Sequence, residues 1–180
     1  MVRPTRPVDA IITDIARAIA GTEVSQTLYQ TLRTVRGVAP IVQTIHILSV
    51  TVLMASVVFV NLRVLGLAVP SQQLPEMLRR LMPWTWMALL LLLLSGSVFV
   101  LALPNRYLHN PVLGIKISML IPAVILAVVF ARLGRREDNY WDASRSRRRG
   151  AKAMASVSLL LWVTVVLAGR WVAYAEYLFP

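Results

Sequence analysis

The chain has 180 residues, of which 57% are hydrophobic and 15% are charged, and its formal net charge is +11. Its mean hydropathy of +0.66 is too high for an ordinary soluble domain and indicates an integral membrane protein. The absence of cysteine excludes disulfides, thiolate metal sites and cysteine nucleophiles.

The N-terminal segment, residues 1–40, has the pattern of an amphipathic helix. Its apolar side chains recur at helical spacing, and Asp9 and Asp14 lie elsewhere on the helical wheel. Gly21 is predicted to end this helix, and a second short helical piece leads towards Pro40. We expect the first helix to lie at the membrane interface through Val8, Ile11, Ile12, Ile15 and Ile19.

The remainder, residues 41–180, contains apolar runs long enough to cross a bilayer. A hydrocarbon core about 30 Å thick requires about 20 helical residues. Four runs meet this requirement, at about residues 41–67, 83–103, 111–133 and 153–177. Because the connections between them are short, successive spans should pack antiparallel. The sequence therefore predicts an all-α fold, a four-helix antiparallel transmembrane bundle preceded by the interfacial helix.

The distribution of Lys and Arg predicts how the spans are oriented. Loops one and three share one side of the membrane and carry eleven of these residues, against eight on the other side. The positive-inside rule then places these loops in the cytoplasm and both termini in the periplasm of a bacterial inner membrane. We expect the arginine-rich third loop to contact anionic lipid headgroups, and we expect no nucleic-acid partner.

Three cationic or potentially cationic side chains are predicted to share one depth in the outer leaflet. His46 lies early in the first span, Lys116 early in the third, and Arg170 near the end of the fourth. A rise of ~1.5 Å per residue in spans of alternating direction converts these positions to similar depths. His109, in loop two, lies two helical turns before Lys116 and would share its face if the helix extended that far.

Each of these residues also has a simpler interpretation. A histidine near a helix start is often only hydrogen-bonded to a neighbour, and lysine and arginine side chains can extend to the interface. Cationic groups gathered at one depth, however, repel one another unless an anion joins them. A ligand carboxylate, a lipid phosphate or the propionates of haem would be such an anion.

Polar residues also mark the opposite leaflet. Asn61 and Arg63 lie near the cytoplasmic end of the first span, where Arg63 is expected to anchor the helix at the headgroups. A second ligand site there is the alternative. Trp162 is expected to pack in the core, with a place in a cavity wall as the alternative, and Pro122 is expected to bend the third span.

The segments QTIHILSVTVLMASVVFVNLRVLGL, LRRLMPWTWMALLLLLLSGSVFVLALP, NPVLGIKISML and SLLLWVTVVLAGRWVAY together resemble a largely uncharacterised bacterial family of small four-span membrane proteins. The chain is also distantly similar to four-helix membrane proteins of the copper-resistance D type and to HemJ-type protoporphyrinogen oxidases. In the latter, a histidine early in one span and a lysine early in a later one are associated with haem b. The resemblance implies these positions for His46 and Lys116.

These observations lead to function hypotheses of different classes. In the first, the protein binds b-type haem or a quinone and transfers electrons. His46 would be the axial metal ligand, His109 or Lys116 the second ligand, and Arg170 the partner of a propionate or quinone oxygen. In the second, the protein is a non-catalytic membrane anchor or accessory subunit that binds lipid and a protein partner. A transporter ranks third because Glu176, at the end of the fourth span, is the only acidic residue in the predicted spans. No catalytic residue is assigned.

Overall fold

The computed structural model describes residues 7–68, 71–136 and 144–174, and these residues confirm the all-α fold. Four of the helices that it describes are long and apolar enough to cross a membrane, which makes the chain a multi-pass membrane protein. The helices are α1 (Pro7–Ala20), α2 (Glu23–Thr34), α3 (Val38–Leu65), α4 (Leu74–Ala102), α5 (Pro104–Leu108), α6 (Pro111–Arg136) and α7 (Arg145–Trp171), followed by the 3₁₀ turn η1 (Val172–Tyr174).

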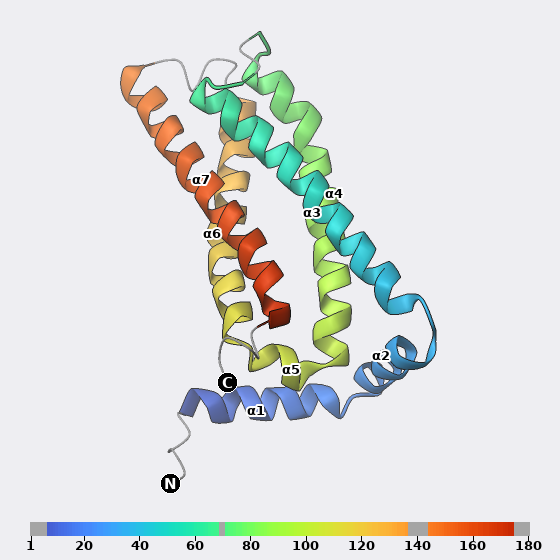
Figure 1. Ribbon diagram of the computed structural model, residues 1–180. Coiled ribbons are helices and arrows are strands. Elements are labelled where there is room, and N and C mark those ends of the chain that lie inside the picture. Colours follow the sequence, from blue (N-terminus) through green and yellow to red (C-terminus); the bar gives the residue numbers. More distant parts are fainter. Residues whose placement is uncertain (1–6, 69–70, 137–143, 175–180) are drawn as a thin grey trace.

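The four spans pack as two antiparallel hairpins (Figure 1). Helix α3 packs along α4, and α6 packs along α7. The two hairpins meet mainly where α3 lies against α7, while α4 and α6 touch less extensively. The bundle therefore has α3 and α7 at its centre, and a ligand held between the hairpins would contact both of them.

The helices extend beyond the apolar runs that predicted them. Helix α4 begins at Leu74 and continues through Pro83, where the span had been predicted to start. Helix α7 begins at Arg145, two turns before its predicted start, with a Ser144 side chain capping its first turn. Hydropathy marks where a chain enters hydrocarbon, whereas the backbone hydrogen bonds of a helix continue into the polar headgroup region. The end predicted for the fourth span, residue 177, lies outside the described residues.

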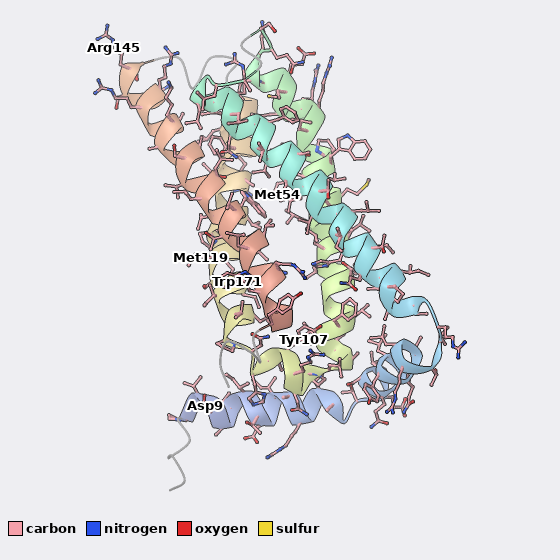
Figure 2. The ribbon with its side chains drawn as sticks, viewed as in Figure 1. Asp9, Met54, Tyr107, Met119, Arg145 and Trp171 are labelled. Atoms are coloured by element: carbon pink, nitrogen blue, oxygen red, sulfur yellow. The ribbon has the colours of Figure 1, made fainter. Side chains whose placement is uncertain are left out.

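The two N-terminal helices lie at one end of the bundle. Helix α1 crosses that end and packs on α5, the short helix between the second and third spans (Figure 1). Helix α2 packs on α4, where the Ser25 hydroxyl donates to the Leu101 carbonyl at 2.7 Å. Figure 2 shows Asp9 of α1 at this end and Arg145 of α7 at the opposite end. Exposed arginines of α7 thus lie far from the amphipathic helix.

The interior of the bundle contains buried clusters that draw on several spans. One cluster contains Leu53, Ala88, Ala123 and Trp162, one residue from each span. A second cluster, nearer the α7 start, contains Val60, Leu78, Met82 and Ala131. Trp162 is fully buried in the first cluster, so its predicted place in the core is correct.

Asn110 joins the third span to the fourth. Its Oδ1 accepts a hydrogen bond from the Val112 N–H at 3.0 Å and so caps the start of α6. Its Nδ2 donates to the Val172 carbonyl at 3.0 Å, just beyond the end of α7. One side chain therefore satisfies a free donor of one helix and a free acceptor of the next.

We expect Asn110→Ala to lower the thermal unfolding temperature in detergent, by an amount equivalent to roughly 1–2 kcal/mol, the usual cost of a lost cap. Asn110→Asp should have a smaller effect, because its carboxylate still accepts from Val112 but has no hydrogen to donate to Val172. Circular dichroism at 222 nm during heating measures both variants. Equal melting temperatures for wild type and Asn110→Ala would contradict this role.

Candidate functional site

His46 is held by a serine of the neighbouring span. Its Nδ1 lies 2.8 Å from the Ser95 Oγ, so a contact between side chains ties α3 to α4 inside the first hairpin. Gly96, the next residue of α4, lies beside the imidazole, because a methyl group built there would be 3.6 Å from the His46 Cε1. The ring is half-buried, and Ser95 is buried. Both serine and glycine are therefore part of the wall that orients the imidazole.

The hydrogen bonds of Ser95 decide which imidazole nitrogen carries the proton. The Ser95 Oγ lies 2.6 Å from the Leu91 carbonyl oxygen, and two oxygens this close require a hydrogen between them. The single hydroxyl hydrogen therefore points at Leu91, so the Oγ accepts from a protonated Nδ1 of His46. In this tautomer Nε2 carries a lone pair, which is the arrangement found in histidines that bind metals.

Lys116 enters the same layer from the second hairpin. Its half-buried side chain lies against α7, because a methyl group built at Gly169 would be 3.5 Å from the Lys116 Nζ. His46 and Lys116 each lie seven residues before a member of the first buried cluster, Leu53 and Ala123 respectively, so they enter the bundle at one level. Within the described part of the chain, no hydrogen-bond acceptor lies within bonding distance of the ammonium group. The structure thus brings His46 and Lys116 together from helices that belong to different hairpins.

Arg170 is adjacent to this layer but does not face it. Its side chain is exposed, and its Nη2 donates to the Tyr174 hydroxyl at 3.0 Å. The guanidinium also lies over the tyrosine ring, 4.9 Å from its centroid. Arg170 follows Gly169, which touches Lys116, so the two residues do lie at one depth. Their charged groups nevertheless have different surroundings.

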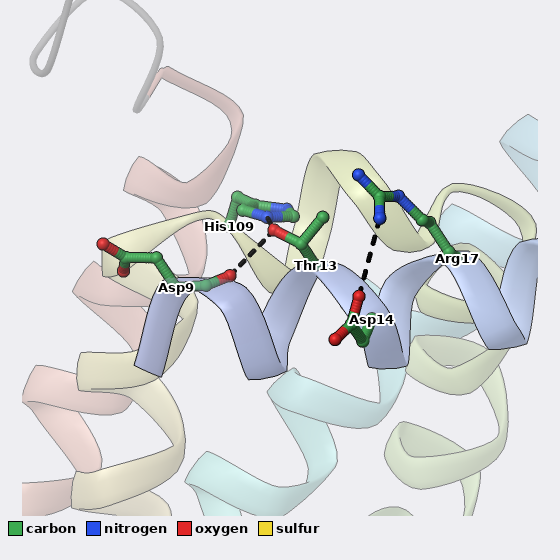
Figure 3. A network of polar contacts seen from close by, with 5 residues as sticks. All are labelled: Asp9, Thr13, Asp14, Arg17 and His109. Atoms are coloured by element: carbon green, nitrogen blue, oxygen red, sulfur yellow. Dashed lines mark hydrogen bonds and ion pairs between the residues drawn. The ribbon is translucent and has the colours of Figure 1, made fainter. Parts of the chain in front are cut away.

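His109 lies outside this layer. His109 would share a face with Lys116 only if α6 extended back to it. Helix α6 instead begins at Pro111, and His109 caps the C-terminal end of the separate helix α5. The exposed ring donates from Nδ1 to the Asn105 carbonyl at 3.0 Å, and its Nε2 lies 3.1 Å from the Thr13 hydroxyl (Figure 3). His109 therefore attaches α1 to α5.

Two other side chains near the ends of the spans, Tyr107 and Arg63, interact with neighbouring parts of the chain. Burial raises the pKa of Tyr107 in α5 above its ordinary value, although the nearby charge of Arg106 acts in the opposite direction. At the other end, the Arg63 Nε donates to the Gln72 carbonyl at 2.7 Å and holds the connection after α3. This contact does not favour the alternative of a second ligand site at Arg63, and Asn61 lies buried in α3.

The layer of His46, Ser95, Lys116 and Gly169 is the candidate site. Each of its members lies seven positions along its own helix from Leu53, Ala88, Ala123 or Trp162 of the first buried cluster. The site therefore lies in heptad register with that cluster, about 10 Å from it at ~1.5 Å per residue. In the sequence, Ser95 and Gly169 are only small residues within apolar runs. Their roles depend on the register between helices, which the sequence of either helix alone does not contain.

These features define a small helical membrane protein with four helices long enough to span a bilayer and a layer near one end of the bundle that contains His46 and Lys116. The chain belongs to the Family of unknown function (DUF6644), whose profile matches residues 21–175. No curated protein matches the chain. No solved structure matches it either.

We expect nitrogen-15 solid-state NMR of the wild-type protein to show His46 as the Nδ1–H tautomer. Ser95→Ala removes the acceptor, so a mixture containing the Nε2–H form should appear. Ser97→Ala is the matched control, because that exposed hydroxyl bonds only to the Leu93 carbonyl of its own helix. A wild-type ring found mainly as the Nε2–H form would refute the assignment.

Proposed function

We propose that the protein is a membrane-embedded redox protein that binds b-type haem between its two hairpins. The observation that carries the proposal is the hydrogen bond from the His46 Nδ1 to the Ser95 Oγ, which leaves the Nε2 lone pair for a metal. The part of the chain that the structure describes contains no group of three metal-binding side chains, so a protein-only metal site is not favoured. A prosthetic group that needs a single protein ligand suits this donor set.

In this proposal His46 supplies one axial ligand through Nε2, and Ser95 fixes the ring orientation. Lys116 would provide the positive charge for a propionate, because no residue that the structure describes supplies its ammonium group with a carboxylate. Bound haem would supply one-electron redox chemistry. His109 is not proposed as the second ligand, because its ring bonds to Asn105 and lies near Thr13. Arg170 could still contact a propionate only by leaving Tyr174.

A quinol fits the same two residues less closely. The His46 Nε2 could accept a hydrogen bond from a quinol hydroxyl, while the Lys116 ammonium donates to the other oxygen. This arrangement uses both groups, but it gives no reason for a tautomer that suits metal binding. We therefore rank quinone second, and the experiment below separates the two cofactors.

The proposal places the protein in a bacterial inner membrane with the site in the outer leaflet. This orientation rests on the excess of Lys and Arg at the end of the bundle that contains the α7 start. No named relative supports the resemblance to HemJ-type or copper-resistance D-type proteins, so that resemblance carries no part of the proposal. We do not propose protoporphyrinogen oxidation or copper transport.

We expect the purified full-length protein, expressed with haem supply, to show a Soret band and a b-type reduced-minus-oxidised spectrum. His46→Ala should abolish both, whereas His109→Ala, the other histidine, should retain them. Lys116→Gln should weaken haem binding by about tenfold, which corresponds to about 1.4 kcal/mol. No Soret band, together with a quinone in the organic extract, would replace haem by quinone. Absence of both would overturn the redox proposal.

An accessory subunit is the second candidate, and helix α1 favours it. Its inner face packs on α5, while the apolar side chains of Val8, Ile11 and Ile15 remain exposed on another face. An exposed apolar stripe of this kind can contact a lipid surface or a partner protein. If it contacts a partner, a larger protein should co-purify with the wild type in mild detergent and be lost with Ile11→Glu. Asp14→Lys, a charge change at an exposed position, should leave any such complex intact.

A further inference from the structure

Two polar atoms in the inner half of the bundle are buried without a hydrogen-bond partner. They are the Asn61 Oδ1 on α3 and the Trp162 Nε1 on α7. A polar atom that is buried without a hydrogen bond destabilises the folded state. Lipid has no donors or acceptors to offset that cost. One atom is an acceptor and the other is a donor, so a single molecule can satisfy both.

The two side chains lean towards the same level of the bundle. The Asn61 amide is turned back along α3, because its Nδ2 donates to the Val57 carbonyl at 2.8 Å. The Trp162 side chain leans towards the start of its own helix, that is towards Ser158, because side chains of a helix tilt towards its N-terminus. Helices α3 and α7 are antiparallel neighbours, so these two tilts converge.

The heptad register shows that the levels coincide. Val57 lies eleven positions after His46 on α3, and Ser158 lies eleven positions before Gly169 on α7. Because His46 and Gly169 belong to one layer, Val57 and Ser158 also share a layer. Val57 and Trp162 belong to one buried cluster, which places the indole beside the backbone that the Asn61 amide contacts.

The side chains of this level are small and partly polar. Val57, Thr85, Ala127 and Ser158 come one from each span, and all four are buried. The Thr85 hydroxyl donates to the Leu81 carbonyl of its own helix. The Ser158 hydroxyl can both donate and accept, so it offers a third contact to a small molecule bound between Asn61 and Trp162.

We propose that one water molecule is bound at this level, between α3 and α7. It accepts a hydrogen bond from the Trp162 indole N–H and donates to the Asn61 Oδ1, with the Ser158 hydroxyl as its third partner. Buried waters in proteins have about three such partners. This water site lies about 16 Å from the His46 layer at ~1.5 Å per residue, and it is independent of any redox cofactor. It links the two hairpins where α3 meets α7.

Water-edited solid-state NMR of the full-length protein in lipid bilayers tests this site directly. Indole N–H groups receive magnetisation from water only when water molecules are close to them. We expect the Trp162 indole signal, identified by its disappearance in Trp162→Phe, to receive magnetisation in the wild type. Asn61→Leu replaces the acceptor with an apolar side chain of similar size, so the transfer to Trp162 should be lost.

Ser56→Ala is the matched control, because this buried hydroxyl of α3 bonds to the Val52 carbonyl and faces no unpartnered atom that the structure describes. It should leave the transfer to Trp162 unchanged. A Trp162 indole that receives no magnetisation in the wild type would overturn the proposal, even if Asn61→Leu does not fold. Transfer that persists in folded Asn61→Leu would also overturn it, because Asn61 would then not hold the water.

Discussion

The low polarity of the bilayer interior is the constraint on which the rest of this structure depends. Backbone groups satisfy it by forming helices, and most hydroxyl side chains satisfy it by bonding to the carbonyl four residues earlier. Ser49, Ser56 and Thr85 are all buried in this way at little cost. A histidine, lysine, asparagine or tryptophan has donors or acceptors that one turn of its own helix does not satisfy completely. Such residues need a partner from another helix or from a bound molecule.

The heptad register determines which residues can be that partner. Ser95 reaches His46 because α3 and α4 are aligned so that both residues fall in the outermost layer. In the same alignment, Lys116 of α6 meets Gly169 of α7, which has no side chain to exclude the long lysine. The hydroxyl of Ser95 serves two purposes, since it donates within its own helix and accepts from the neighbouring one. A shift of one helix by a single residue would separate these groups.

The sequence predicts the helices better than it predicts the site. Apolar runs and amphipathic spacing locate the spans and the N-terminal helix, because each of these features depends on one helix alone. Span edges were less accurate, since α4 continues through Pro83 and α7 begins among arginines. His46 and Lys116 could be selected as rare polar residues within apolar runs. The sequence did not predict that His109 lies apart from them. His109 belongs to the end of the short helix α5, and the third span begins only after it, at Pro111.

The same constraint distinguishes the two interior sites from each other. In the outer layer the unmet requirement is a charge, since the Lys116 ammonium needs an anion and the His46 Nε2 offers a lone pair. Further inside, the missing partners are uncharged hydrogen-bonding groups, since the Asn61 Oδ1 lacks a donor and the Trp162 Nε1 lacks an acceptor. An ion or charged cofactor is favoured in the first place and a neutral molecule in the second. Both sites lie between the hairpins, so molecules bound there would stabilise the contact on which the bundle depends.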